Sequence, residues 1–464
     1  MRFFDTSSSR GFYRTRLATK WTIVVLAWLI TALATSSASF AKTLHIIHTN
    51  DLHGRLIQEK DTAGVARIAR FIQDTRAETD WLLTLDAGDA ISGTPVSSIF
   101  LGEPIFEIMN LMDYDLGLLG NHEFDHGYEQ IDRFLEIANF PLISANAFNP
   151  EGELIADEPF LIKQIGDISV GIIGLTTPDT PKITTPEGNE GLTIQSIETT
   201  LPPLIQTLEP KVDVLIFLTH LGYEEDLALA EAFPNADLIV GGHSHTMVPH
   251  PVRVGDTWVV QADHYGKHVG LIALELEEKD NGYSVQNVTG GLVRADELPP
   301  GDPRVEATVN HYEAQVAERV DQTIMVSDRA YSKDELQPIL EEMLRAALDA
   351  DLGFYNRGGI RDEITTGPVS ARMIWNIEPF GNSLVRLTIK GSDLLILLSQ
   401  EREVHHAAAN IDPERIYQLA TNSFIGSHAA MAFGDAVTLQ DTGTMIRDVL
   451  INHIQRNGLP DQGL

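Results

Sequence analysis

The sequence predicts an α/β protein built from two successive α/β bodies with a helix between them. From Thr43 to about Val293, short apolar runs alternate with helical or loop stretches, which is the pattern of an α/β domain. The alternation resumes near Val326, with a predicted helix over Asp334–Leu348 and a strand over 352–355. We therefore expect a signal segment at 1–41, a first domain at 42–295, a linker helix at 296–325 and a second domain at 326–464.

The linker is recognised by a change in composition followed by a regular apolar pattern. Residues 294–304 read RADELPPGDPR, and such a cluster of Pro, Gly and acidic residues is typical of a domain boundary. Apolar side chains then recur at helical spacing, at Val305, Val309, Tyr312, Val316 and Val320. One apolar stripe of this period predicts an amphipathic helix that packs on a domain face.

The first 41 residues have the order of a secretory signal peptide. A basic segment at 1–20 is followed by an apolar stretch at 21–34 and by the small-residue tail TSSASFA, with Ser39-Phe40-Ala41 as the expected cleavage triplet. An uncleaved anchor is the alternative, but the apolar stretch is shorter than the ~17–25 residues that a spanning helix needs. We expect an exported protein, periplasmic or secreted, without stable membrane insertion after cleavage.

Composition limits the classes of partner. The 464 residues carry 33 Lys and Arg against 66 Asp and Glu, a formal net charge of −33, and no Cys. This surface would repel polyanions, so polymeric nucleic acid is not expected as a partner. The lack of Cys excludes disulfides, thiolate metal sites and a Cys nucleophile. A small anionic substrate would need local positive charge, which bound cations are one way to supply.

Five apolar runs in the first body each end in a cluster of Asp, Asn or His. In open α/β sheets, ligands gather outside the carboxyl ends of the strands, so these loops can converge on one site. One such cluster is a weak signal, because Gly and Asn also favour ordinary turns. Five in order make a strong joint signal, and they lie at Thr49–Gly54, Asp86–Asp89, Gly120–Asp125, Thr219–Gly222 and Gly241–His245.

The residue types in these loops favour metal chemistry. Carboxylate and amide oxygens beside imidazole nitrogens suit Zn²⁺, Mn²⁺ or Fe, and the sequence does not distinguish among them. Asp51 and His53 are two residues apart, as are His243 and His245, so each pair can grip one ion from an extended chain. A site with this many ligands fits two ions roughly 3.5–4 Å apart, with Asp89 as the natural bridge beside Gly88.

The ordered motifs resemble those of the calcineurin-like metallophosphoesterases. They are Asp51-x-His53, Gly88-Asp89, Gly120-Asn121-His122-Glu123, His220 and Gly242-His243-Ser244-His245. The flanking words TNDLHGRL, GNHEFDHG and LTHLGYEEDLALA narrow the resemblance to the 5′-nucleotidase family, which includes secreted nucleotidases, UDP-sugar hydrolases and 2′,3′-cyclic phosphodiesterases. The resemblance implies a four-layer α/β/β/α metallophosphoesterase domain and a smaller, shortened C-terminal α/β nucleotide-binding domain.

The resemblance also implies roles for individual residues. Asp51, His53 and His245 correspond to ligands of one ion, and Asn121, His220 and His243 to ligands of the other, with Asp89 shared. His122 corresponds to the catalytic His and Asp125 to its partner, which would orient the imidazole and raise its basicity. The implied reaction is hydrolysis of a nucleotide phosphate ester by metal-activated water.

The second domain raises the question of the substrate. Asn356-Arg357-Gly358-Gly359-Ile360-Arg361 resembles the family's nucleotide motif, in which Asn356 reaches the base, the glycines allow close approach and Arg361 reaches phosphate or ribose. Phe380 and Phe424 correspond to two rings that stack on the base. However, Ile425-Gly426-Ser427-His428 stands where the family usually has Gly-Gly-Asp and an aromatic residue.

Three functions therefore stay open at this point. The leading one is hydrolysis of nucleotides, as 5′-monophosphates, cyclic esters or nucleotide sugars. The second is a phosphoesterase of the same mechanism with a non-nucleotide substrate, which the missing Gly-Gly-Asp favours. The third is a non-catalytic binding protein, which an intact His122 and Asp125 disfavour because binding needs no general acid. The sequence does not decide the oligomeric state.

Overall fold

The computed structural model describes residues 42–59, 61–184, 190–399 and 411–460, which lie in one compact unit beginning at Lys42. The predicted signal segment is outside the described residues. Within the described ranges, no helix is both long and apolar enough to cross a membrane. The domain limits given above stay a prediction, because the chain from Lys42 onward forms a single contact unit.

A first six-stranded sheet carries three of the polar loops. Its central strands are parallel neighbours, and an antiparallel hairpin extends one edge. The order across the sheet is β14 (Gly282–Arg294), β13 (His268–Lys279), β1 (Lys42–Thr49), β2 (Leu82–Asp86), β3 (Leu116–Leu118) and β4 (Leu142–Ile143). The carboxyl ends of β1, β2 and β3 therefore lie side by side at one edge of the sheet.

A second six-stranded sheet carries the other two loops. Its order is β11 (Val252–Val254), β12 (Thr257–Gln261), β10 (Leu238–Gly241), β9 (Val214–His220), β7 (Ile168–Thr176) and β6 (Phe160–Ile165). Fully buried aliphatic side chains from both sheets pack against one another between them, for example Ile46, Leu85, Ile172 and Ile216. This apolar layer holds the two sheets face to face and so brings their loop-bearing ends together.

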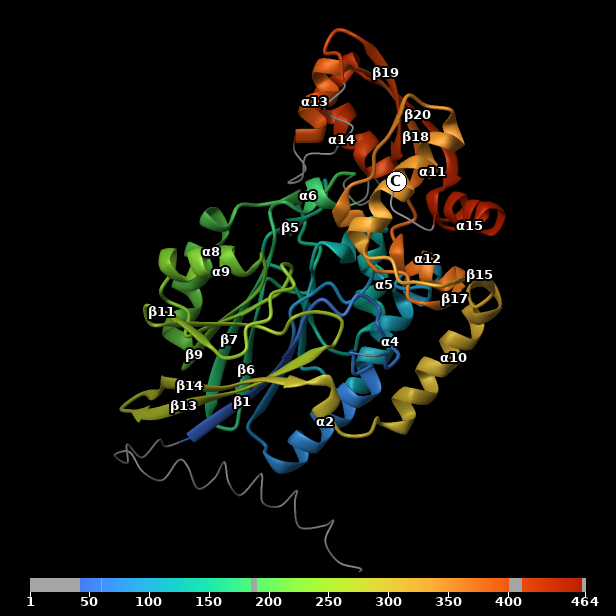
Figure 1. Cartoon of the computed structure of the whole chain (residues 1–464). Helices are drawn as coiled ribbons and strands as arrows, with labels where there is room; N and C mark the ends of the chain where they lie inside the picture. The colour runs from blue at the N-terminus through green and yellow to red at the C-terminus, as the bar shows by residue number, and fades with distance from the viewer. Residues whose placement is uncertain (1–41, 60, 185–189, 400–410, 461–464) are drawn as a thin grey trace, which may run out of the picture. The chain divides into compact units, whose positions relative to one another are not determined.

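Helices cover the outer face of each sheet, which gives the four-layer α/β/β/α architecture (Figure 1). The first sheet is covered by α2 (Val65–Glu78), α3 (Pro95–Ile99), α4 (Glu103–Met112) and α5 (Glu129–Ile137). The second is covered by α8 (Ile197–Leu208) and α9 (Tyr223–Ala232). The short elements β5 (Ala147–Phe148), α6 (Thr180–Ile183) and β8 (Thr193–Ile194) lie in the connections. The predicted architecture is confirmed.

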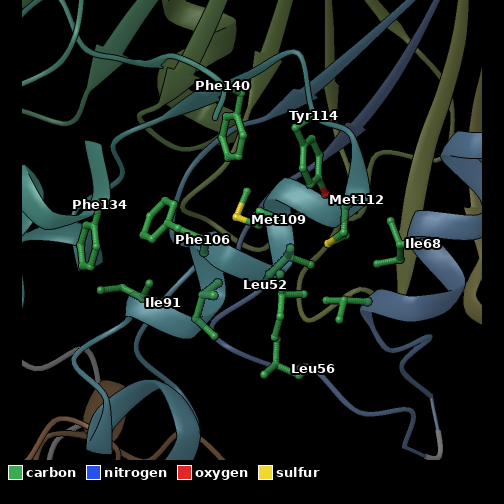
Figure 2. Close-up of a cluster of buried hydrophobic side chains, with 14 of the residues drawn as sticks. Leu52, Leu56, Ile68, Ile91, Phe106, Met109, Met112, Tyr114, Phe134 and Phe140 are labelled. Atoms are coloured by element: carbon green, nitrogen blue, oxygen red, sulfur yellow. The ribbon is translucent and has the colours of Figure 1, made fainter. Parts of the chain in front are cut away.

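The core under the first sheet also anchors the polar loops. Figure 2 shows Leu52 and Ile91 among the aromatic and Met side chains of this core, close to Phe106 and Met109. Leu52 lies between Asp51 and His53, and Ile91 lies two residues after Asp89. Burying an aliphatic side chain of this size contributes about 1.5–3 kcal/mol, so the core fixes the backbone of the loops that carry these polar groups.

The predicted linker helix is α10 (Pro303–Val320), and the expected valines are its buried face. Asp302 caps its first turn by accepting hydrogen bonds from the backbone N–H groups of Arg304 and Val305 at 2.8 and 3.2 Å. The helix packs on α2, α3 and α4 and also contacts α12 (Ala371–Ile377), so it touches both α/β bodies.

The C-terminal body is a four-stranded sheet with helices on it. The strand order is β16 (Leu352–Gly353), β19 (Ile416–Asn422), β18 (Ser383–Lys390) and β20 (Thr438–Met445). Its helices are α11 (Lys333–Leu348), α13 (Gly391–Ser399), α14 (Ser423–Phe433) and α15 (Ile446–Asn457), and β15 (Thr323–Ser327) pairs with β17 (Gly367–Ser370). The strand expected over 352–355 is shorter, because the Tyr355 N–H leaves the ladder and donates to the Glu341 carboxylate at 3.2 Å.

Candidate active site

The five polar loops meet at one place between the two sheets. Three overlapping groups of side chains there each bring their ligand-type atoms within 4.8 Å of one another. One group is Asp51, His53 and His245, and a second is Asp89, His220 and His243. The third is His53, Asp89 and His122, which joins the other two through shared residues. The seven side chains come from strand ends of both sheets, where α/β proteins usually place their ligand sites.

Hydrogen bonds outside the cluster fix which imidazole nitrogen faces inward. His53 Nδ1 lies 2.9 Å from the carbonyl oxygen of Ser92, and His220 Nδ1 lies 2.7 Å from that of Ala87. A carbonyl only accepts, so each Nδ1 donates and each Nε2 keeps its lone pair when the ring is neutral. The His53 and His245 Nε2 atoms face each other at 3.1 Å. This is the arrangement of rings that hold a cation through Nε2.

Several buried atoms of the cluster have no hydrogen-bond partner among the described residues outside the cluster itself. They are Asp51 Oδ1, Asn121 Oδ1 and His220 Nε2. An unpaired buried polar atom costs about 1–3 kcal/mol, which a bound cation would offset. Oxygen and imidazole nitrogen donors suit Zn²⁺, Mn²⁺ or Fe, so the residues present fit a divalent metal site.

The charges of the cluster are mutually supportive. Burial alone would raise the pKa of the Asp89 carboxyl, but the nearby His220 and His122 imidazoles outweigh it and hold that pKa well below its ordinary value. Asp89 Oδ2 lies 3.0 Å from His220 Nε2. Asp89 is therefore ionised at neutral pH, and a cation bound at His220 Nε2 would take the place of the proton that this nitrogen carries beside Asp89.

Part of the backbone of these loops is in the left-handed conformation, which is unfavourable for residues that have a Cβ atom. Five candidate ligand residues have φ in the left-handed region, namely Asp51 (52°), His53 (48°), Asp89 (55°), His243 (76°) and His245 (55°). Such conformations cost of order 1–3 kcal/mol each and persist only where the surroundings impose them. Gly120 allows a further close approach, since a Cβ at that position would lie 2.3 Å from Asp89 Oδ1.

Glu123 ties two of the loops together, and sequence reasoning assigned no role to it. Its carboxylate accepts hydrogen bonds from the backbone N–H groups of Asp89 at 3.0 Å, Ala90 at 2.8 Å and Gly120 at 2.7 Å. The side chain is buried. It therefore holds the loop that bears Asp89 against the loop that bears Asn121.

His122 and Asp125 form a hydrogen-bonded pair at the edge of the cluster. His122 Nδ1 lies 2.7 Å from Asp125 Oδ2, and the backbone N–H of His122 donates to Asp89 Oδ1 at 2.8 Å. Burial would lower the pKa of His122, but the Asp125 and Asp89 carboxylates outweigh it and raise that pKa above its ordinary value. The Nε2 edge can thus carry a proton near neutral pH.

A cavity of about 330 Å³ opens beside His122 and contains all six predicted substrate residues. These are Asn356, Gly358, Gly359, Arg361, Phe380 and Phe424, and they share the cavity with Asn121, Asp125 and His243. The Phe380 ring stacks on the His122 ring, with centroids 5.4 Å apart and an angle of 16° between the planes. The cavity therefore joins the polar cluster to the C-terminal motifs.

The structure adds residues that the sequence did not single out. Ile183, Thr184 and Asn382 also line the cavity. Asn382 Oδ1 accepts from the Phe424 N–H at 3.2 Å and so fixes the two phenylalanine loops to each other. Asn382 stands beside Phe380 in a recognisable motif, whereas Ile183 and Thr184 lie in a segment without a pattern.

Two arginines connect the C-terminal motif to the polar loops. Arg361 Nη2 lies 3.1 Å from His53 Nε2, so its guanidinium stands next to the candidate metal ligands. Arg55, which is buried, forms an ion pair with Asp362 at 2.8 Å. The ion pair holds the segment that contains Arg361 over the cluster.

The other histidines that the structure describes are not among the residues of these three groups, although the His264 ring stacks on the His245 ring with centroids 4.4 Å apart. His264 and His268 flank the carboxylate of Asp263, with Nδ1–O distances of 2.5 and 2.9 Å, and His48 is completely buried in β1. His250 lies at the surface, where its Nδ1 is 3.1 Å from the Gly290 carbonyl oxygen. His405 and His406 lie outside the described residues.

Comparison with known proteins identifies the family. The calcineurin-like phosphoesterase family matches residues 44–247, and the 5′-nucleotidase C-terminal domain matches residues 311–410. The chain is 31% identical to the 5′-nucleotidase of Bos taurus over 408 residues, which cover 76% of this chain and 70% of the relative. It is 27% identical to the protein UshA of Yersinia enterocolitica over 499 residues, covering 89% and 90% of the two chains.

A crystal structure of a 5′-nucleotidase precursor from Thermus thermophilus has the same fold. Its TM-score is 0.81 at 25% sequence identity, over 91% of this chain and 98% of that one. The resemblance inferred from the motifs is thus confirmed. The chain belongs to the 5′-nucleotidase family of the calcineurin-like phosphoesterases and is a hydrolase of phosphoric esters.

Proposed function

We propose that this enzyme hydrolyses phosphate esters of nucleotides at a centre of two divalent cations. The observation that carries the proposal is the shared cavity, in which His122 and the C-terminal motif residues line one space of about 330 Å³. A cavity of that size is suited to a single small organic phosphate rather than a polymer. The relatives named 5′-nucleotidase support the nucleotide as the organic part.

The cluster divides into two sets of candidate ligands. Asp51, His53 and His245 would hold one ion, and Asn121, His220 and His243 would hold the other, with Asp89 between them. Divalent cations bound there supply positive charge for phosphoryl oxygens and lower the pKa of water. Zn²⁺, Mn²⁺ and Fe are the metals that this donor set favours.

The chain's own residues have separate tasks in this reaction. Arg361 stands beside His53 and can donate charge-assisted hydrogen bonds to phosphoryl oxygens. His122 can give its Nε2 proton to the leaving oxygen, because Asp125 holds the ring through Nδ1. Phe380 and Phe424 line the cavity, one face of Phe380 being covered by the His122 ring, and stacking of a base on such rings would contribute about 1–3 kcal/mol.

A non-nucleotide phosphate ester is the second candidate, and one observation favours it. Where the family usually has Gly-Gly-Asp and an aromatic residue after its second phenylalanine, α14 continues as a helix to Phe433. The acidic group expected to hold a ribose is therefore missing from this turn. Rates of hydrolysis of a monoester, a cyclic diester and a nucleotide sugar decide which of these the enzyme prefers.

We infer that the chain is exported after cleavage behind Ala41. The basic, apolar and small-residue segments of 1–41 support this, and β1 begins at Lys42, directly after the expected cleavage triplet. Mass spectrometry of the protein recovered from a periplasmic or culture fraction tests it. A mature chain that begins at Lys42 is expected, and a chain retaining 1–41 in the membrane fraction would contradict it.

Hydrolysis of four phosphate esters tests the function. The chain from Lys42 onward is supplied with Mn²⁺ or Zn²⁺, and inorganic phosphate is measured with AMP and with a simple aryl phosphate. The first hydrolysis of a cyclic 2′,3′-nucleotide or a nucleotide sugar yields a phosphate monoester instead of inorganic phosphate, so the products of these two substrates are separated and identified. We expect faster turnover of a nucleotide than of the aryl ester, abolished by chelator. Chelator-sensitive activity on the aryl ester alone would retain the metal centre and refute the nucleotide.

A further inference from the structure

The first α/β body contributes its own wall to the substrate cavity. Ile183 and Thr184, at the end of α6, line the cavity together with Phe424 of the second body. Ile183 is half-buried and Thr184 is buried. We call these two residues the α6 wall. A side chain such as Ile183 can neither bind phosphate nor transfer a proton, so in this cavity it could contact only the organic part of a substrate.

The α6 wall is fixed to the sheet that bears two of the polar loops. Thr180, at the start of α6, is completely buried, and its hydroxyl donates to the Thr177 carbonyl at 2.7 Å. The Thr184 N–H donates to the Thr180 carbonyl at 3.1 Å. Thr177 directly follows β7, which pairs with β9, the strand that ends at His220. The wall thus has a fixed position relative to the strand that carries His220.

His428 connects this wall to the helix that carries Phe424. It lies one turn after Phe424 in α14, with ring centroids 4.3 Å apart, and its Nδ1 is 2.7 Å from the Phe424 carbonyl oxygen. Its Nε2 makes a hydrogen bond to the backbone carbonyl of Lys182, the residue before Ile183. Both contacts are to carbonyl oxygens, which only accept, and a neutral imidazole has a single N–H. The tautomer with its proton on Nε2 donates to the Lys182 carbonyl, and only the doubly protonated ring donates to both carbonyls.

The contact uses the backbone of Lys182 and leaves its side chain elsewhere. The Lys182 ammonium pairs with Asp179 at 2.6 Å on the exposed surface. His428 itself is not among the residues that line the cavity. Its hydrogen bond therefore affects a substrate only through the spacing between Ile183 and Phe424.

We propose that the α6 wall determines specificity for the organic group of the substrate, and that His428 is the positioning residue that sets the distance between this wall and Phe424. The group recognised is the planar ring system that would stack on Phe380 and Phe424, with the aliphatic side chain of Ile183 against it from the first body. His428 belongs to the segment that stands in place of the family's Gly-Gly-Asp motif. In this chain the segment thus contributes a contact between the two bodies instead of a contact to ribose. This inference rests on the proposed nucleotide function.

The test separates recognition of the ring system from chemistry on the phosphate. Ile183→Ala, His428→Ala and His428→Gln are assayed on AMP and on a small aryl phosphate, with adenosine binding to the chelator-treated protein measured by calorimetry. Ile183→Ala should raise the KM for AMP and the adenosine Kd about 5- to 50-fold, because it removes three carbons of apolar contact. The kcat on both substrates should stay within about twofold.

His428 requires a conservative variant and a matched control. His428→Ala should raise the AMP KM about 3- to 10-fold, the usual effect of one lost hydrogen bond, whereas His428→Gln, whose amide N–H₂ can donate to the Lys182 carbonyl, should recover most of it. Lys182→Ala keeps the backbone carbonyl and should retain the wild-type ratio of the two KM values. Ile183→Val, which keeps the fold with one methyl fewer, should give a smaller change in the same direction as Ile183→Ala.

The outcomes distinguish this inference from the function on which it rests. Wild-type turnover of AMP with unchanged KM and Kd in the Ile183 and His428 variants would overturn the inference and leave the function standing. A wild-type enzyme that does not hydrolyse nucleotides would overturn both the inference and the proposed function. Equal losses of kcat on AMP and the aryl ester in His428→Ala, without rescue by Gln, would make His428 a general structural residue and refute the positioning role.

Discussion

His48 should make the enzyme lose stability in mild acid. Its side chain is completely buried in β1, and neither ring nitrogen has a hydrogen-bond partner among the described residues. Gly270 on the neighbouring strand makes room for it, since a Cβ there would lie 1.9 Å from His48 Nε2. Burial lowers the pKa of His48 from its ordinary 6.5 to about 4.

The sign and size of the effect follow from this pKa. The unfolded chain binds a proton near pH 6.5, whereas the folded chain does so near pH 4, so the stabilising contribution is complete above pH 6.5 and is lost as the pH falls towards 4. Each pKa unit corresponds to about 1.4 kcal/mol. The loss should therefore reach about 2 kcal/mol at pH 5 and about 3 kcal/mol at pH 4.

Urea denaturation of wild type and His48→Leu between pH 4.5 and 8 measures this contribution. Other titrating groups are common to both proteins, so the difference in their unfolding free energies isolates His48. That difference should shift by about 2 kcal/mol in favour of the Leu variant from pH 8 to pH 5. His311→Gln, on the exposed face of α10, is the control that removes a histidine without burial. Parallel profiles for wild type and His48→Leu, within about 0.5 kcal/mol, would refute the reasoning.

Three further predictions concern the site and its supports. Burial raises the pKa of Asp226 to about 8, so its stabilising contribution is present below pH 4 and is lost as the pH rises towards 8. In that range, the unfolding free energy of Asp226→Asn, measured by urea denaturation, should rise relative to that of wild type by up to about 1.4 kcal/mol per pH unit. A difference in unfolding free energy that does not change with pH would contradict this. His122→Ala should retain the wild-type metal content, read by elemental analysis, while turnover falls ~10²–10⁴-fold; loss of metal and fold together would make His122 structural. Phe424→Ala should raise the KM for AMP about 5- to 100-fold while sparing a small aryl phosphate, and equal losses on both would argue against base stacking.

The polar cluster was predictable because strand ends carry it in chain order. Asp51, Asp89 and His220 each follow an apolar run, and parallel neighbours bring such ends to one edge without any long-range information. The valine stripe of α10 was also predictable, because the helical spacing of apolar residues on a surface helix can be read from the local sequence.

Contacts between distant segments were not predictable in this way. The ion pair between Arg55 and Asp362 joins residues that are 307 positions apart, and the local sequence around each residue contains no pattern that predicts its partner. The α6 wall comes from a four-residue helix, which is too short to show a period. His48 could not be distinguished from a solvated histidine, because the end of β1 is buried on both faces and shows no alternation.

The left-handed backbone of the candidate ligand residues has an implication for how such an enzyme can change. Asp51, His53, Asp89, His243 and His245 all occupy conformations that glycine adopts freely, so glycine at any of them would relieve backbone strain in the metal-free protein. Selection for heat resistance in a chelating medium would therefore act first on His243 and His245, which are half-buried, because removing the buried Asp51, His53 or Asp89 side chain would also leave a cavity and unpaired hydrogen-bond donors. The same selection with metal supplied would retain these ligand residues, because metal that binds only the folded state adds stability that offsets the backbone strain.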